Sequence, residues 1–378
     1  MDLSSDESED WFIDSLHMYK DLHVFQLEHP TKVIEWTDEK SICVAGYSSA
    51  KSEILELLLP LKLYVKGNQG LCPERDFKVL HGGFSDEQVK CLRHVGNRCL
   101  VTSGQHSSNL QVWNIGGDQS DVIKKTGVIN CTATSATCRK LAARVTGDAS
   151  VLHGSLVSDV QQTEISSGKV QYAVGTDSMD TVSGLQFVNA NTFLICASNG
   201  TLYTGDTRDP TIKHYCLQES ADGSDWVFGL NTDGTSSDPA SCSAARLSST
   251  GQVIVSDLRN PSAPVKQAQL NLNVTGSDFL TVTWAPALDS HLAVSGFDGH
   301  MRVFDTVSWT ADPEQHPEPT FIHRGHEMSR EEKINAATPL VVTTHVWHPQ
   351  RQRTLLSAAS DGSVHVWDWV DKQDENVE

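Results

Sequence analysis

The sequence predicts an all-β protein, a seven-bladed β-propeller whose ring is closed by an N-terminal strand that completes the last blade. Three observations support this prediction: a C-terminal hairpin that ends on Trp-Asp, weaker copies of that hairpin upstream, and a last blade that lacks an outer strand. Residues 355–368 read LLSAASDGSVHVWD. Asp-Gly between two alternating strands is the strongest short-range hairpin signal, and a hairpin ending on Trp-Asp is typical of a propeller blade.

The same hairpin recurs along the chain with decreasing clarity. Residues 291–305 read HLAVSGFDGHMRVFD, and residues 193–206 read FLICASNGTLYTGD. Weaker copies are expected at 98–114, 245–257, 140–154 and 43–57. Together with the C-terminal copy these make seven hairpins, spaced by roughly 40 to 60 residues, a period that indicates a propeller array.

A short strand precedes several of these hairpins and carries an aromatic residue near its end. These residues are Trp36 in VIEW, Phe187 in LQF, Trp284 in VTWAP and Trp347 in HVWHP. One such strand before each hairpin and another after it complete a blade of four strands.

The last blade lacks a fourth strand, because only the acidic segment DKQDENVE at 371–378 follows the strand of Trp367. An open sheet edge exposes unpaired N–H and C=O groups, which propellers avoid by closing the ring. The segment DLHVFQLEHP at 21–30 has strand character. We therefore expect it to supply the missing strand, with the propeller at 21–370 between an acidic leader at 1–20 and an acidic tail at 371–378.

The chain resembles the WD40-repeat family over essentially its whole length. The segments MDLSSDESEDW, YKDLHVFQLEHPT and SAASDGSVHVWDW carry the resemblance. Members of that family hold a blade together with a tetrad of His, Ser or Thr, Asp and Trp. By position, the resemblance implies a structural tetrad of Ser357, Asp361 and Trp367 in the last blade, with His326 as the candidate fourth member and an insertion after it at 327–339.

Composition argues against nucleic-acid and membrane binding. The 378 residues include 29 Lys and Arg against 48 Asp and Glu, a formal net charge of −19. Nucleic-acid binders need basic patches, and no run of Lys or Arg appears. The longest apolar stretch, 54–65, is interrupted by Glu56, Pro60 and Lys62 and is shorter than the roughly 18 to 20 residues that span a bilayer. Without a secretory signal pattern, we expect a cytoplasmic protein.

No motif marks a catalytic, cofactor or metal site. The nine Cys residues are an odd number without framework spacing, which indicates reduced thiols in a cytosolic protein. His323 and His326 lie close in sequence but without CxxC or HExxH context. There is no nucleophile motif and no phosphate-binding loop. We therefore expect no enzyme, no cofactor and no metal, with a propeller enzyme as a remote alternative.

The function that these exclusions leave is the binding of other proteins. Residues that depart from the repeat pattern are candidates for the binding surface. Trp11, Trp226 and Trp309 lie outside the predicted strands, and exposed aromatic residues are enriched at interaction hot spots. Each of them can instead pack on its own blade. The inserted loop 306–339 is the first candidate for a docking element, because long loops in compact repeats are often functional.

A repeated Asp-x-Arg motif supports a rival hypothesis. DTRDP at 206–210 and DLRNP at 257–261 follow two adjacent hairpins. Arg208 and Arg259 in this position resemble the motif with which substrate receptors of the cullin-4 RING ubiquitin ligase bind its adaptor, although Gly205 and Ser256 stand where that motif has Trp. The same sequence is also a good turn.

We expect a monomeric, non-enzymatic protein-interaction scaffold. The resemblance implies a mainly cytoplasmic factor, with some nuclear presence, that associates with spindle poles and microtubules in mitosis. It further implies an assembly factor that holds and stabilises the nuclease subunits of the RNA-processing Integrator complex. A substrate receptor of the cullin-4 ligase is the alternative.

Overall fold

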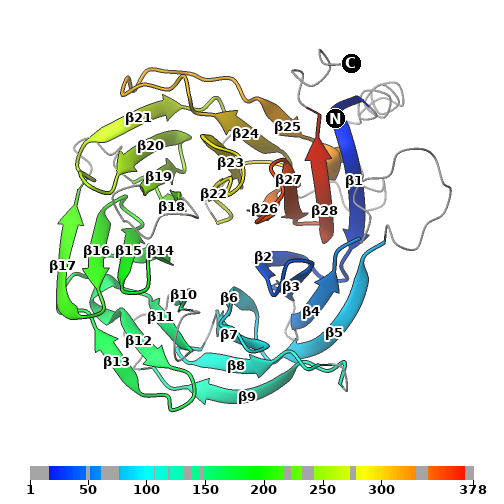
Figure 1. The fold of residues 1–378 in the computed structure, drawn as a ribbon, viewed down its shortest axis with the longest axis vertical. Coiled ribbons are helices and arrows are strands. Elements are labelled where there is room, and N and C mark those ends of the chain that lie inside the picture. The colour runs from blue at the N-terminus through cyan, green and yellow to red at the C-terminus, as the bar shows by residue number, and fades with distance from the viewer. Residues whose placement is uncertain are drawn as a thin grey trace.

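The chain folds into a ring of seven four-stranded antiparallel sheets, as the computed structural model in Figure 1 shows. The structure describes residues 17–47, 52–60, 76–105, 107–117, 120–131, 138–144, 149–216, 223–231, 242–272, 278–328 and 339–370. The prediction of a seven-bladed propeller closed by an N-terminal strand is confirmed.

Each of the first six blades uses four strands that follow one another along the chain, from the innermost strand to the rim. Blade one contains β2 (Thr31–Trp36), β3 (Ser41–Gly46), β4 (Ser52–Leu58) and β5 (Lys78–Ser85). Blade two contains β6 (Val89–His94), β7 (Cys99–Gly104), β8 (Leu110–Asn114) and β9 (Lys124–Ile129). Blade three contains β10 (Lys140–Arg144), β11 (Ser150–Gly154), β12 (Gln161–Glu164) and β13 (Val170–Ala173).

The second half of the ring repeats this order. Blade four contains β14 (Val182–Phe187), β15 (Thr192–Ala197), β16 (Leu202–Asp206) and β17 (Asp209–Tyr215). Blade five contains β18 (Trp226–Asn231), β19 (Ser243–Ser248), β20 (Gln252–Asp257) and β21 (Pro264–Gln269). Blade six contains β22 (Thr281–Trp284), β23 (His291–Ser295), β24 (Met301–Asp305) and β25 (Phe321–His323).

The last blade joins the two ends of the chain. It contains β26 (Val342–Trp347), β27 (Thr354–Ala359) and β28 (Ser363–Trp369), and its outer strand is β1 (Tyr19–Gln26). β1 pairs antiparallel with β28, with Leu22 opposite Trp367. In Figure 1 the blue first strand therefore lies beside the red last strand. Helical structure among the described residues includes η2 (Val157–Asp159) and α2 (Gly325–Met328).

The hydrophobic core lies between neighbouring blades. One cluster packs Met301 and Val303 of β24 against Leu355 of β27, Trp367 of β28 and Tyr19 of β1. The sequence pattern explains this arrangement, because every residue of the second strand β27, TLLSAA, is buried, whereas the outer strand β17, DPTIKHY, has no buried residue. A strand between two neighbouring blades contacts apolar side chains on both faces, and a rim strand does not.

Six of the predicted hairpins coincide with the second and third strands of a blade, and the hairpin at 140–154 does not. It consists of β10 and β11, the first and second strands of blade three. The prediction was one strand out of phase there, because the weak copy KLAARVTGDASVLHG lacks both the Asp-Gly turn and the terminal aromatic residue.

The stretch 306–339 is not simply an inserted loop, and that prediction was wrong for its described part. Residues 321–323 form β25, the fourth strand of blade six, and 325–328 form α2. Residues 306–320 run along the outer strand β21, where the backbone N–H of Gln267 donates to the carbonyl of Thr310 (2.7 Å) and that of Gln269 to the carbonyl of Gln315 (2.8 Å). This segment runs along the outer side of β21 in Figure 1 and covers a sheet edge that would otherwise be unpaired.

Two further features bear on the class of protein. None of the helices in the described part of the chain combines the length and apolar character that crossing a bilayer requires. The eight cysteines among the described residues are all free thiols.

Candidate functional site

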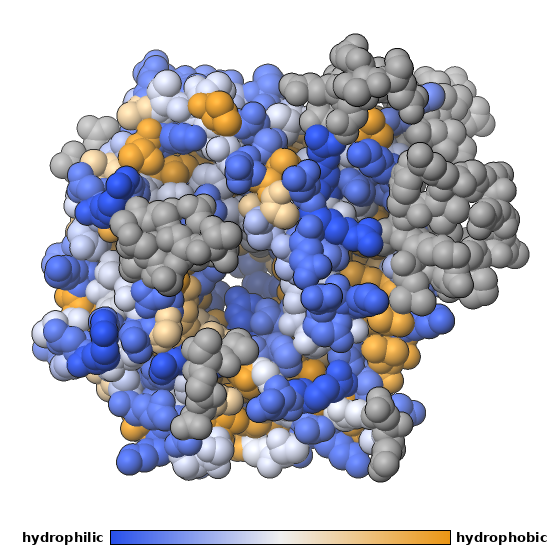
Figure 2. Space-filling view, in the orientation of Figure 1, coloured by the Kyte–Doolittle hydropathy of each residue, from blue (hydrophilic) through white to orange (hydrophobic). Residues whose placement is uncertain are grey.

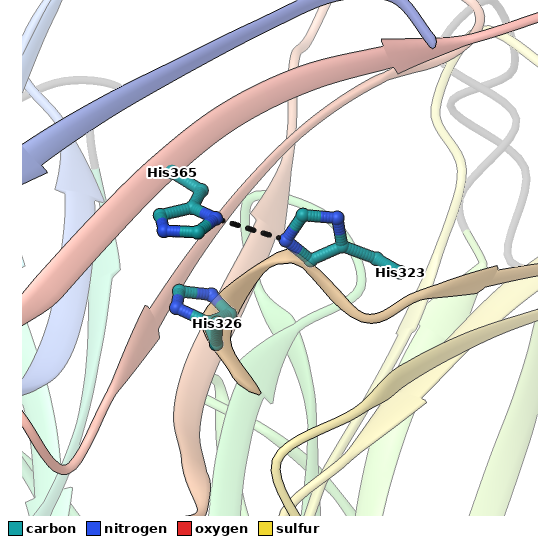
Figure 3. Close-up of side chains that lie close together, drawn as sticks. All are labelled: His323, His326 and His365. Carbon is teal, nitrogen blue, oxygen red and sulfur yellow. Dashed lines mark hydrogen bonds between the residues drawn. The ribbon is translucent and has the colours of Figure 1, made fainter. Parts of the chain in front are cut away.

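Three buried histidines meet where the ring closes. His323 ends β25, His326 lies in α2, and His365 lies in β28. Each is fully buried, with 0% of its surface exposed. Their rings converge in Figure 3, with Nε2 of His323 at 3.1 Å from Nδ1 of His365 and the ring of His326 stacked on that of His365 at 3.8 Å. The cluster therefore joins blade six to blade seven.

Three of the four tetrad residues that the resemblance implies, His326, Ser357 and Trp367, are linked by hydrogen bonds. Nε2 of His326 lies 2.8 Å from Oγ of Ser357, and the indole N–H of Trp367 donates to the same oxygen (3.2 Å). Asp361 does not contact His326 directly. Instead, Oγ of Ser363 donates to Oδ1 of Asp361 (2.7 Å) and lies 2.7 Å from Nδ1 of His326.

These contacts determine the tautomer of His326. A serine hydroxyl carries one hydrogen, and that of Ser363 is directed at Asp361. Ser363 therefore accepts from the Nδ1–H of His326, which leaves Nε2 to accept from the hydroxyl of Ser357. Burial lowers the pKa of His326 to about 3, which agrees with a neutral ring bonded at both nitrogens.

A second hydrogen-bonded chain reaches the N-terminal strand. The hydroxyl oxygen of Tyr19 in β1 lies 2.8 Å from Nδ1 of His323. Burial raises the pKa of Tyr19, so the hydroxyl stays protonated and donates a hydrogen bond to Nδ1 of His323. His323 then donates from Nε2 to His365. Burial and the neighbouring histidines hold the pKa values of His323 and His365 well below the usual range.

The donor set could hold a metal ion only at the expense of these bonds. The ring nitrogens of His323, His326 and His365 lie within 4.8 Å of one another, and three imidazoles are a common zinc ligand set. Both ring nitrogens of His323 and His326, and Nδ1 of His365, already have a hydrogen-bond partner. Ligation by His326 would break its bond to Ser357 or Ser363, so the residues present fit a structural hydrogen-bond network better than a metal centre.

The tryptophans proposed as partner contacts lie elsewhere, and the proposal was wrong for two of them. Trp226 is 1% exposed and begins β18, the innermost strand of blade five. Trp309 is 4% exposed and packs edge-on against Phe304, with ring centroids 6.0 Å apart. Both side chains are part of the interior and cannot reach a partner. Trp11 lies outside the described residues.

Arg208 and Arg259 are on the surface. Their side chains are 71% and 67% exposed, and each forms a salt bridge with the Asp two residues earlier, Asp206 or Asp257. The hydrogen bond from Arg208 lowers the pKa of Asp206 to about 2. The two motifs are thus equivalent turns in neighbouring blades, and each guanidinium is already bonded to a carboxylate of its own turn.

Two buried polar groups that also connect blades were not identified from the sequence. His345 of β26 lies 2.7 Å from Oγ1 of Thr283 and 2.8 Å from Oγ of Ser295, both in blade six. Glu56 of β4 is fully buried and accepts two hydrogen bonds from Arg98, at 3.0 and 2.8 Å, between blades one and two. For His345, the strand sequence HVWHP could have indicated a buried histidine. For Glu56, the only indication in the sequence was its position in an apolar strand.

Comparison with known proteins agrees with this architecture. The family model described as "WD domain, G-beta repeat" matches residues 318–368, which include β25, the histidine cluster and the three C-terminal strands. A protein of Danio rerio named "Integrator complex assembly factor WDR73" is 59% identical over 375 residues, which cover 98% of this chain and 99% of that protein.

Mammalian relatives carry the same name. The protein of Mus musculus is 42% identical over 380 residues, covering 97% of this chain and 99% of its own length. The protein of Homo sapiens is 42% identical over 378 residues, covering 97% and 98%. The chain therefore belongs to the WDR73 family of WD40-repeat proteins.

Proposed function

We propose that this chain is a non-enzymatic scaffold that binds other proteins during assembly of the Integrator complex. The observation that carries the proposal is 59% identity, over 98% of the chain, to a protein named an Integrator complex assembly factor. A match over almost the full length of both chains applies to the whole propeller and not to a single repeat.

The buried histidines have structural contacts, which supports a binding role for the protein and not a catalytic one. Buried histidines whose pKa values lie below their usual range include His323, His326 and His365, which hydrogen-bond to neighbouring strands. Perturbed titratable groups often mark active sites, but here they hold blades together and have no solvent exposure. A rigid ring with loops on both faces is suited to holding several partners.

A finer assignment extends this proposal. We infer that the partners include the nuclease subunits of Integrator, that the protein acts as a monomer mainly in the cytoplasm with some nuclear presence, and that it associates with spindle poles and microtubules in mitosis. No cofactor and no direct contact with nucleic acid or membrane is part of this proposal. A propeller enzyme remains the remote alternative.

Affinity purification tests the proposal. The tagged chain is purified from dividing cells and its partners are identified by mass spectrometry, beside the destabilised variant Trp367→Ala. We expect Integrator nuclease subunits with the wild type and their loss with the variant. Absence of every Integrator subunit from the wild-type sample would overturn the assignment.

A second candidate, a substrate receptor of the cullin-4 RING ligase, is favoured by one observation. Arg208 and Arg259 are exposed at equivalent turns of adjacent blades. The variant Arg208→Ala with Arg259→Ala tests it, with Lys124→Ala and Lys169→Ala, two exposed cations of other blades, as the matched control. Loss of the cullin-4 adaptor with the first variant alone would favour the ligase; retention of Integrator subunits by both variants would favour the assembly factor.

A further inference from the structure

Three lysines occupy matching places at one mouth of the central opening. Lys32 is the second residue of β2, Lys90 the second of β6, and Lys140 the first of β10. These are the innermost strands of three consecutive blades. Because each blade contains four antiparallel strands, every innermost strand starts on the same face of the ring. The three side chains therefore lie around one sector of the opening that Figure 2 shows at the centre of the molecule.

The charges of these lysines are close enough to act on one another. The pKa of Lys32 is lowered to about 8, first by burial and then by the charges of Lys140 and Lys90. Asp278 and Cys138 act in the opposite direction but do not compensate. Repulsion between like charges at this mouth contrasts with the rest of a chain whose net charge is −19.

Aromatic rings accompany two of the ammonium groups. Nζ of Lys32 lies 5.0 Å from the ring centroid of Phe279, and Nζ of Lys90 lies 5.2 Å from that of Tyr47. The two rings are 5.6 Å apart. Within the described part of the chain, none of the three lysines has a carboxylate within salt-bridge distance. We call Lys32, Lys90, Lys140, Tyr47 and Phe279 the lysine mouth.

The three lysines together with the two aromatic rings favour a ligand that has both negative charge and an apolar part. Lys140 and Lys90 repel the positive charge of Lys32, and a bound anion would relieve that repulsion. The two half-buried rings add apolar contact area, which a peptide side chain can use and a bare phosphate cannot. Charges distributed over three blades match carboxylates spaced along an extended chain. A long nucleic-acid backbone would be repelled by the remaining acidic surface.

We propose that the lysine mouth binds an acidic peptide segment of a protein partner, with carboxylates at the three lysines and an apolar side chain on Tyr47 and Phe279. This proposal adds a binding surface to the proposed scaffold function. It depends on that function in one respect, that the partner is a protein. Its test requires no Integrator protein, so the two proposals can fail separately.

The probe is a fluorescent peptide, EEEFEEFEEE, whose binding to the purified full-length chain is followed by fluorescence anisotropy. The variant Lys32→Gln, Lys90→Gln, Lys140→Gln is compared with a control, Lys124→Gln, Lys125→Gln, Lys213→Gln, which removes the same charge from exposed positions of β9 and β17. We expect about tenfold weaker binding for the first and no change for the control, since each exposed charge pair contributes a factor of roughly two to five. If the triple variant does not fold, the single variant Lys90→Gln replaces it, and we expect it to bind the peptide about two- to fivefold more weakly than the wild type.

Three results would overturn the proposal. Equal weakening by both triple variants would show unspecific charge attraction. Equal binding of the neutral peptide QQQFQQFQQQ would show that the carboxylates are irrelevant. Displacement of the acidic peptide by inorganic triphosphate at lower concentration than the peptide itself requires would assign the mouth to phosphate ligands instead.

Discussion

At the scale of single residues, the junction of the two chain ends depends on buried polar side chains that are hydrogen-bonded. Ser357, Ser363 and His326 have almost no exposure, and each bonds another member of the set. A buried polar group without a partner costs about 1 to 3 kcal/mol, so removing one member leaves the others unsatisfied. The histidine cluster therefore makes the position of β25 and α2 depend on that of β28.

Truncation of Trp367 should be strongly destabilising. Its side chain is 0% exposed, stacks on His323 at 4.5 Å and packs against Tyr19. Trp367→Ala should lower the free energy of unfolding by roughly 3 to 5 kcal/mol, measured by urea denaturation. Arg208→Ala, on the surface, is the control and should stay within about 0.5 kcal/mol. An unchanged midpoint for Trp367→Ala would contradict the packing described.

The hydroxyl of Ser363 connects Asp361 to His326, a contact that the tetrad pattern did not include. Ser363→Ala removes the acceptor for the Nδ1–H of a fully buried ring. We expect the free energy of unfolding to fall by about 1 to 3 kcal/mol. Ser166→Ala, an exposed serine bonded to Glu164, should have little effect. Equal stabilities of the two variants would mean that the contact is not formed.

The sequence could predict the tetrad but not its surroundings. Ser357, Asp361 and Trp367 have fixed spacing around an Asp-Gly turn, so their positions follow from the repeat. His323 and His365 become neighbours only when blade six packs on blade seven, which no local pattern reveals. Trp226 was misjudged because its strand, WVFGLN, has a Gly and no alternation, so it was not recognised as a strand.

At the scale of elements, β1 is the strand on which closure depends. It pairs with β28 along its length, and the backbone N–H of Leu27 donates to the carbonyl of Gly362 (2.9 Å) while that of Val370 donates to Met18 (2.9 Å). The sequence could predict that such a closing strand exists, because the C-terminal segments supply only three strands of the last blade. The edge protection of β21 by 306–320 could not, since that segment, TVSWTADPEQHPEPT, is rich in Pro and polar residues and has no strand pattern.

Removal of either end of the ring should open it. Deletion of residues 1–26 exposes the edge of β28, and truncation before Thr354 removes β27 and β28. We expect both products to be aggregated in size-exclusion chromatography, because unpaired edges associate. Deletion of residues 1–16, which leaves β1 intact, is the matched control and should elute as a monomer. A monomeric, cooperatively melting product without β1 would contradict the role of the closing strand.

At the scale of the whole molecule, the interior contains buried neutral histidines, and this makes stability depend on pH. Burial lowers the pKa values of His153, His326 and His345 to about 3, whereas an unfolded His titrates near 6.5. Well above pH 6.5 the rings are neutral in both states, and their contribution to stability is fully present. As the pH falls below 6.5, only the unfolded chain takes up protons, so stability is lost down to about pH 3.

This linkage predicts acid lability. Between pH 7 and pH 5.5 each of the three rings should cost roughly 1 kcal/mol, a large share of a total stability of about 5 to 15 kcal/mol. Urea denaturation at a series of pH values measures the slope. The variant His345→Asn should lower that slope by about one proton. A free energy of unfolding that does not change between pH 7 and pH 5.5 would show that these rings are not held neutral.

Depletion with rescue measures whether this propeller assists assembly of the Integrator complex. Cells depleted of the endogenous protein are supplied with the wild-type chain, the Trp367→Ala variant or the lysine-mouth triple variant, and assembled Integrator is measured on native gradients. We expect the wild type to restore assembled Integrator and Trp367→Ala to fail, while the lysine-mouth variant reports whether that surface takes part. Normal amounts of assembled Integrator in depleted cells without rescue would contradict a role in assembly.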